Sequence, residues 1–251
     1  MMRILSTLLA AALLATAGLQ PAGAAPPPEA TPLTFQASDG VTVHARYYPA
    51  ATPKALILLF HQAGSSKDEY ATIAPRLAAA GYSALAVDQR SGGSLFGVNE
   101  TAAGLGRDPG YLAAKQDLEG ALRWGEAQHQ PLVLWGSSYS AALVFLVAAE
   151  HPGAVRAVLA FSPGEYLNPS DAVRRASAQL RAPVFVTSAQ DAGEIAAARA
   201  ILAASPAQVK VQYVPSQGGV HGSSTLIAAR NPGGAEANWQ AALAFLKAAL
   251  G

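Results

Sequence analysis

Short apolar runs alternate with segments of helical periodicity along most of the chain. The run at residues 55–60 is continuously apolar, which predicts a strand covered on both faces, as in a parallel sheet. Further strands are expected at residues 82–87, 131–135, 154–161, 183–188 and 209–214. Helices are expected between them, at residues 68–80, 111–128, 139–150, 170–180, 192–204 and 235–250. This alternation predicts an α/β fold with a mainly parallel sheet and helices on both of its faces.

The first two strands follow a different pattern. Residues 34–38 and 41–48 are expected to pair through an Asp39-Gly40 turn, a strong hairpin signal. Apolar and polar side chains alternate along the second of these strands, so only one of its faces is buried. We therefore expect a sheet of about eight strands that begins with an antiparallel pair.

Composition narrows the possible classes of protein. The chain has 251 residues, of which 51% are hydrophobic, enough for one core in a single domain over residues 33–251. The net charge is +1 with 13% charged residues, which argues against a nucleic-acid partner. The sequence contains no cysteine, and this excludes disulfides, thiolate metal sites and cysteine nucleophiles.

The N-terminal segment reads as a signal peptide over residues 1–25. Arg3 precedes an apolar stretch at residues 4–19, and Ala22-Gly-Ala24 has the small residues of a cleavage site near Ala24. A membrane anchor is less favoured, because the stretch is short and prolines follow it. We expect a periplasmic or secreted protein, without stable membrane insertion after cleavage, whose residues 26–32 form a proline-rich linker.

A small-residue turn, Gly136-Ser-Ser-Tyr-Ser140, joins the strand at residues 131–135 to the next helix. A serine at the tip of such a turn is forced into an unusual backbone conformation with its hydroxyl exposed above the sheet. The nucleophile at such a turn needs small residues two positions before it and two positions after it. Ser138 has Gly136 and Ser140 at these positions, whereas Ser137 has the bulky Trp135 on its strand side. Ser140 lies further into the helix. The alternative is that Ser138 merely caps that helix.

Five polar side chains follow strand ends, where ligands bind in open α/β sheets: His61, Asp88, Ser138, Asp191 and His221. A serine nucleophile needs a histidine base and a carboxylate that orients it. His221 is the predicted base, because it alone of the five histidines follows the acid and it lies in a glycine-rich loop.

Asp191 is the predicted acid, since it directly follows a strand. Its alternative role is to cap the helix that begins at Ala192. Glu194 and Asp171 are weaker candidates, because each lies further into a helical pattern.

Backbone N–H groups should stabilise the oxyanion. One expected donor is the N–H of Tyr139, which begins a helix. The other comes from the loop after residue 60, where Ala63 is the first candidate and Gln62 the second. We expect His61 to brace this loop through its ring nitrogens.

The chain resembles the α/β-hydrolase superfamily over residues 33–250, in particular its dienelactone-hydrolase-like and small-esterase branches. Three features carry the resemblance: the turn Gly136-Ser-Ser-Tyr-Ser140, called the elbow below, the chain order Ser138, Asp191, His221, and the loop that begins with His61. The resemblance implies the α/β-hydrolase fold and serine hydrolase activity on carboxylic esters, with no cofactor and no metal. Two positions depart from the usual pattern. Ser140 replaces a glycine and is expected to strain the elbow, and Gln62 replaces the glycine after His61.

Two connections bear on the substrate. Lipases insert a large lid between the strands that correspond to residues 154–161 and 183–188, but here only residues 162–181 separate them. Residues 91–110 are expected to form either a pocket wall or a mobile surface loop. An accessible site suits a small or soluble ester as the partner. Two alternatives stay open: a peptidase or other acyl hydrolase with the same triad, and an inactive hydrolase fold used for binding.

Overall fold

The computed structural model describes residues 29–107 and 109–251. Its centre is an eight-stranded sheet in the order β1-β2-β4-β3-β5-β6-β7-β8. β1 pairs with β2 and β2 with β4 in antiparallel register, and all other neighbours are parallel. The strands are β1 (Thr31–Gln36), β2 (Thr42–Tyr48), β3 (Ala55–Phe60), β4 (Tyr82–Val87), β5 (Leu132–Ser137), β6 (Val155–Phe161), β7 (Val184–Thr187) and β8 (Lys210–Tyr213). The predicted fold class is confirmed.

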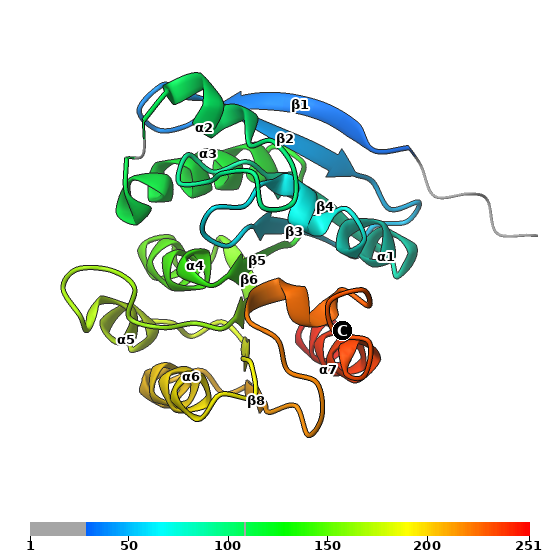
Figure 1. Ribbon diagram of the computed structural model, residues 1–251, viewed down its shortest axis with the longest axis vertical. Coiled ribbons are helices and arrows are strands. Elements are labelled where there is room, and N and C mark those ends of the chain that lie inside the picture. Colours follow the sequence, from blue (N-terminus) through cyan, green and yellow to red (C-terminus); the bar gives the residue numbers. More distant parts are fainter. Residues whose placement is uncertain (1–28, 108) are drawn as a thin grey trace, which may run out of the picture.

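Helices cover both faces of the sheet (Figure 1). The α-helices are α1 (Ile73–Ala79), α2 (Glu100–Leu105), α3 (Lys115–Glu126), α4 (Tyr139–Glu150), α5 (Ala172–Ser177), α6 (Ala192–Ala204) and α7 (Ala235–Leu250). Three 3₁₀ segments are η1 (Lys67–Tyr70), η2 (Tyr111–Ala114) and η3 (Gly222–Leu226). α1 and α7 lie on one face, and α3 to α6 lie on the other (Figure 1).

Alternating side chains of the buried strands divide the core into two layers. On β3, Leu56 and Leu58 pack toward α3 and α4, whereas Ile57 and Leu59 pack toward α1 and α7. All six residues of β3 are buried, as its continuous apolar run predicts. The sheet is thus a rigid base, and the loops at the carboxyl ends of its strands can hold fixed positions.

Several element boundaries differ from the expected ones for local reasons. The helix expected at residues 68–80 is divided into η1 and α1, because Pro75 has no backbone N–H and fits only in the first turn of a helix. Within the loop expected at residues 91–110, Asn99 caps α2 by accepting a hydrogen bond from the N–H of Ala102. The expected linker ends earlier than predicted, since Thr31 and Pro32 already pair with β2.

The predicted signal peptide lies in residues 1–28, outside the described part of the chain. Within residues 29–107 and 109–251, no helix is long and apolar enough to cross a membrane.

Candidate active site

The turn between β5 and α4 has the expected strained geometry. Ser138 has φ 60° and ψ −122°, and a Cβ on Gly136 would lie 2.5 Å from Cα of Ala141. Glycine at position 136 therefore lets strand and helix pass this close together. The strain is located at Ser138, whose hydroxyl is held above the end of the sheet.

Ser140 does not strain the elbow, contrary to expectation. It lies in the first turn of α4, and its φ is not positive. Its buried hydroxyl accepts from the N–H of Ser137 at 2.8 Å and donates to the carbonyl of Phe60 at 2.7 Å. Serine is small enough for this position, and its oxygen links the end of β5 to the end of β3.

His221 lies next to Ser138. Nε2 of His221 is 2.8 Å from Oγ of Ser138, and Nδ1 is 2.8 Å from Oε1 of Glu194. The carboxylate accepts the Nδ1 proton, and this leaves Nε2 free to accept the serine proton. An arrangement of this kind can activate a serine hydroxyl, with the carboxylate of Glu194 orienting the imidazole.

The carboxylate next to His221 is that of Glu194, and Asp191, which the sequence predicted for this place, does not contact His221. Asp191 instead caps α6, because its Oδ1 accepts from the N–H of Glu194 at 2.9 Å. Glu194 lies in the first turn of α6, and its longer side chain also accepts from the N–H of Ala189. The order Asp191-Ala-Gly-Glu194 has the spacing of a capping box. This pattern could have indicated from the sequence that Asp191 caps the helix.

The carboxylate and the imidazole shift each other's pKa. Partial burial raises the pKa of Glu194, but hydrogen bonds from His221, Ser162 and the Ala189 N–H outweigh it and lower the pKa to about 2. The hydrogen bond to Glu194 raises the pKa of His221 above its ordinary value, although burial opposes this. Glu194 is therefore ionised at neutral pH, and its charge favours the imidazolium that forms when His221 takes a proton.

Two backbone N–H groups are available near Ser138. Tyr139 begins α4, so its N–H has no partner within the helix, and the N–H of Ala63 has none among the described residues. Gln62 cannot serve as the second donor, because its N–H already donates to Oε2 of Glu69 at 2.8 Å. This corrects the expectation for Gln62 and leaves Tyr139 and Ala63 as candidate oxyanion donors.

His61 holds the loop after β3 through both ring nitrogens. Its Nδ1 donates to the carbonyl of Gln62 at 2.7 Å, and its Nε2 accepts from the N–H of Gln89 at 3.2 Å and from Asn99. Complete burial lowers the pKa of His61 to about 4, so the ring is neutral. His61 therefore links the loop that follows β3 to the loop that follows β4, as expected for a residue that braces the first of them.

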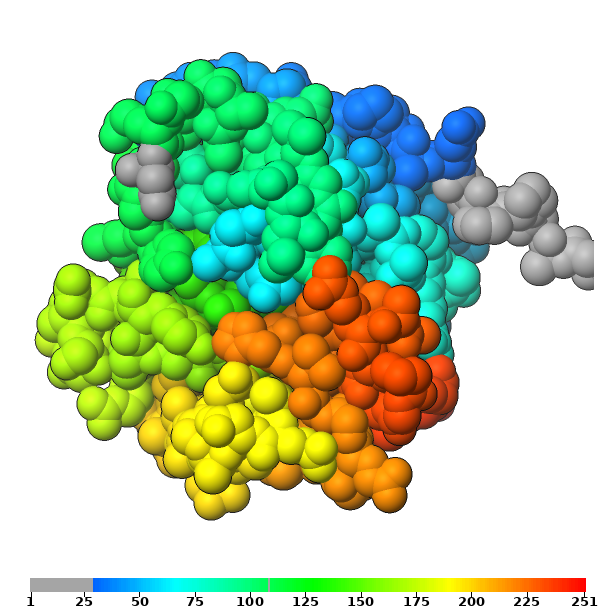
Figure 2. All heavy atoms as spheres, in the orientation of Figure 1, coloured from blue at the N-terminus to red at the C-terminus, as the bar shows by residue number. Residues whose placement is uncertain are grey.

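Aromatic side chains line the approach to Ser138. The hydroxyl of Tyr166 donates to the carbonyl of Ser162 at 3.1 Å and lies near enough to Ser138 to interact with it. The ring of Tyr111 stacks on Tyr139 with centroids 4.5 Å apart. Figure 2 shows a hollow where the cyan segment after β3, the yellow-green segment after β6 and the orange segment before α7 meet.

The segment before α2 packs on the loop that carries Ala63. The N–H of Gly93 donates to the carbonyl of Ser65, and the N–H of Leu95 donates to that of Gly64. Asp88, which also follows a strand end, is separate from the Ser138–His221 pair and binds Lys67.

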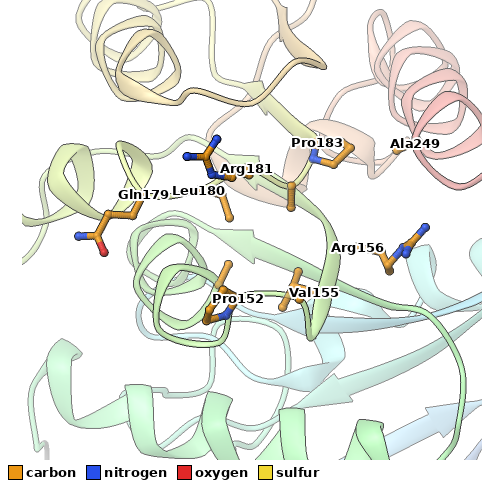
Figure 3. A pocket seen from close by; sticks show the side chains of 11 residues that line it. Pro152, Val155, Arg156, Gln179, Leu180, Arg181, Pro183 and Ala249 are labelled. Carbon is orange, nitrogen blue, oxygen red and sulfur yellow. The ribbon is translucent and has the colours of Figure 1, made fainter.

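One cavity lies beside the starts of β6 and β7, at the opposite end of the sheet from Ser138, and Figure 3 shows side chains that line it. It has a volume of about 470 Å³ and is lined by residues that include Pro152, Arg156, Leu180 and Arg181. None of its lining residues belongs to the Ser138–His221–Glu194 arrangement. Nor does the described part of the chain contain a cluster of three histidine or carboxylate side chains that could hold a metal ion.

Comparisons with known proteins find one matching family model and many solved structures of similar fold. The family model described as serine aminopeptidase, S33, matches residues 51–212. The chain has no significant sequence match among curated proteins.

Three solved structures illustrate the similarity in fold. A dienelactone hydrolase from Anabaena variabilis superposes with a TM-score of 0.72 at 20% identity, covering 90% of this chain and 100% of that chain. A Pyrococcus furiosus esterase has a TM-score of 0.64 at 16% identity, with 89% and 92% covered. A cold-adapted esterase from an Arctic intertidal metagenomic library has a TM-score of 0.57 at 20% identity, with 74% and 82% covered.

Proposed function

Since the chain belongs to the serine aminopeptidase S33 family of α/β hydrolases, we propose that it cleaves carboxylic esters of small or soluble substrates through an acyl-enzyme on Ser138. That it is a hydrolase follows from the family. The observation that supports the mechanism is the line of two 2.8 Å contacts from Ser138 through His221 to Glu194. An inactive binding protein has no need of this arrangement.

In the first half of the reaction, Oγ of Ser138 attacks the ester carbonyl carbon while Nε2 of His221 takes its proton. Glu194 stabilises the imidazolium. The carbonyl oxygen becomes negative and accepts hydrogen bonds from the N–H groups of Tyr139 and Ala63. The tetrahedral intermediate then collapses, the alcohol leaves with the proton from His221, and the acyl group stays on Ser138.

Water completes the reaction. Nε2 of His221 removes a proton from a water molecule as its oxygen attacks the acyl carbon. The second tetrahedral intermediate expels Oγ of Ser138, which recovers its proton from His221. The carboxylic acid is released, and the enzyme returns to its starting state.

The surroundings of Ser138 support a small or soluble substrate. Between β6 and β7 the chain forms only one short helix, α5, so this connection contains no large lid. Tyr111 and Tyr166 are 40% and 37% exposed and offer apolar ring surface beside the nucleophile. Rings of this kind suit the apolar part of an ester, while the open approach suits a soluble one.

Ester and amide substrates use the same groups, so leaving-group preference depends on the shape of the pocket. The solved structures reported above are named as a dienelactone hydrolase and as esterases, which favours esters. The description of the family as a serine aminopeptidase supports a second candidate, a peptidase with the same three side chains.

A fluorophosphonate probe tests the nucleophile. The purified protein should be labelled, and Ser138→Ala should abolish the labelling, with Ser140→Ala as the matched control that keeps it. Labelling that survives Ser138→Ala would place the nucleophile elsewhere. p-Nitrophenyl esters of increasing chain length, compared with amino-acid p-nitroanilides, then separate the two candidates, and turnover of the anilides alone would exclude the esterase.

The charge and apolar pattern of residues 1–25 supports export to the periplasm or the medium. Mass spectrometry of the protein recovered outside the cytoplasm should give a mature N-terminus close to Ala24. An intact Met1 on the exported protein would contradict cleavage.

A further inference from the structure

Glu69 is a fully buried carboxylate that the reaction above does not use. It lies in η1, beneath the loop that carries Ala63. Its Oε2 accepts from the N–H of Gln62 at 2.8 Å, and its Oε1 accepts from the hydroxyl of Ser137 at 2.7 Å. One carboxylate thus contacts the residue before Ala63 and the residue before Ser138.

The Ser137 hydroxyl extends these contacts to the base. Its Oγ accepts from the N–H of Ser223 at 2.8 Å, and Ser223 lies two residues after His221. Glu69 and Ser137 therefore join three segments that are far apart in the sequence. These are the loop that carries Ala63, called the oxyanion loop below, the elbow with Ser138, and the loop with His221.

Two hydrogen bonds fix successive peptide groups in the oxyanion loop. Glu69 holds the N–H of Gln62, and His61 holds the carbonyl of Gln62. In a trans peptide the carbonyl and the following N–H point in opposite directions, so the bond to the Gln62 carbonyl also directs the N–H of Ala63. With both peptide planes fixed, this N–H can be preorganised for a developing oxyanion.

Glu69 has no cationic partner, unlike two other buried carboxylates. Lys67 pairs with Asp88 and Arg90 pairs with Asp117, but no lysine, arginine or histidine lies within ion-pair distance of Glu69 in the described chain. Burial accordingly raises the pKa of Glu69 to about 7. A buried carboxylate without a counter-charge is costly for folding, and such groups gather at functional sites.

We propose that Glu69 is a positioning residue of this hydrolase, which holds the Ala63 N–H in the oxyanion site and keeps the Ser138 and His221 segments in register. The inference rests on the proposed function. Three ionisable groups face the carboxylate. His221 lies on the loop before η3, Tyr70 is the next residue of η1, and Tyr139 begins α4. The charge of Glu69 contributes to raising the pKa of His221.

The test compares Glu69→Ala and Glu69→Gln with Glu236→Gln, a control at an exposed glutamate on α7. Steady-state kinetics with a p-nitrophenyl ester should show that Glu69→Ala lowers kcat by about 10²–10³-fold, the effect of losing one oxyanion donor, with KM nearly unchanged. A trifluoromethyl ketone, which forms a tetrahedral adduct with Ser138, should bind more weakly by the same factor. Glu69→Gln should recover part of the loss, because its amide oxygen can accept from the Gln62 N–H.

The pH profile separates positioning from a general loss of structure. In Glu69→Gln the acid limb of kcat/KM should move to lower pH, because the neutral side chain no longer raises the pKa of His221. If Glu69→Ala does not fold, Ser137→Ala provides the second measurement. It should lower kcat less than Glu69→Gln does, and the two effects should not add in the double variant, because the side chains share one hydrogen bond.

Two different failures can be told apart. If the wild-type protein neither reacts with the fluorophosphonate nor hydrolyses esters, the proposed function itself is wrong. If the wild type is active but the Glu69 variants match Glu236→Gln in kcat, ketone affinity and pH profile, only the role of Glu69 is overturned. Additive effects of Glu69→Gln and Ser137→Ala would also contradict it.

Discussion

Nδ1 of His221 lies 2.8 Å from Oε1 of Glu194, whereas Asp191, three residues earlier, uses its carboxylate to cap α6. Both carboxylates belong to the same helix start, yet only the longer side chain reaches the histidine. The carboxylate that contacts His221 therefore comes from inside the helix and not from the end of the strand.

The first prediction separates these two carboxylates. Glu194→Gln should lower kcat by about 10⁴-fold, since a neutral amide neither holds the required tautomer nor stabilises the imidazolium. Asp191→Ala should leave kcat within a few fold and cost about 1 kcal/mol of unfolding free energy, the usual effect of losing a helix cap. Ester kinetics and urea unfolding on both variants measure this. The opposite ranking of the two kcat values would restore Asp191 as the acid.

The second prediction concerns pH. His221 must be neutral to accept the serine proton, so kcat/KM should fall as the pH decreases through the pKa of His221. Glu194 raises that pKa, so the midpoint should lie above the ordinary histidine value of 6.5. In Glu194→Gln the residual activity should have its acid limb at lower pH. Profiles of kcat/KM between pH 4 and 9 would show this, and an unshifted limb would contradict it.

The same pair links pH to stability. The pKa of Glu194 is lowered in the folded state from 4.5 to about 2, so its stabilising effect is present above 4.5 and is lost as the pH falls toward 2. The raised pKa of His221 has the opposite sign: its stabilising effect is present below 6.5 and is lost as the pH rises through the folded value. Urea unfolding across this range should therefore show a wild-type advantage over Glu194→Gln that shrinks at both ends.

The third prediction tests the close packing of the elbow. In Gly136→Ala the new Cβ would lie 2.5 Å from backbone atoms of Ser140 and Ala141, so the turn must shift. We expect a cost of about 1–3 kcal/mol and loss of activity, because the shift moves Ser138. Gly104→Ala, in α2 with nothing within 4 Å, is the control and should stabilise the protein by up to about 1 kcal/mol. Equal effects at both glycines would contradict the steric argument.

The fourth prediction concerns Ser140. Ser140→Ala leaves the buried N–H of Ser137 without its acceptor, which should cost about 1–3 kcal/mol in urea unfolding. Ser140→Gly removes the same acceptor and should destabilise by at least as much, although glycine is usual at this position of the family. A more stable Ser140→Gly would show that the serine strains the elbow after all.

Local patterns in the sequence were sufficient to predict the scaffold and two residues of the candidate site. A continuous apolar run predicted β3 and a mostly apolar one predicted β4, each with the bounds that the structure shows. The small residues around Ser138 predicted a turn whose strain arises within five positions. Glycines around His221 and its order in the chain pointed to that histidine. Each of these inferences depends on sterics or periodicity over a short stretch of chain.

Tertiary structure decided which polar groups meet. Whether Asp191 or Glu194 reaches His221 depends on where α6 begins and on the length of one side chain. The N–H of Gln62 is unavailable because Glu69, seven residues later, folds back beneath it, and Glu69 also reaches Ser137 from a distant strand. Contacts like these form only after the sheet has brought its loops together, so the sequence by itself determined Ser138 and its elbow, and the packing of loops determined the carboxylates around them.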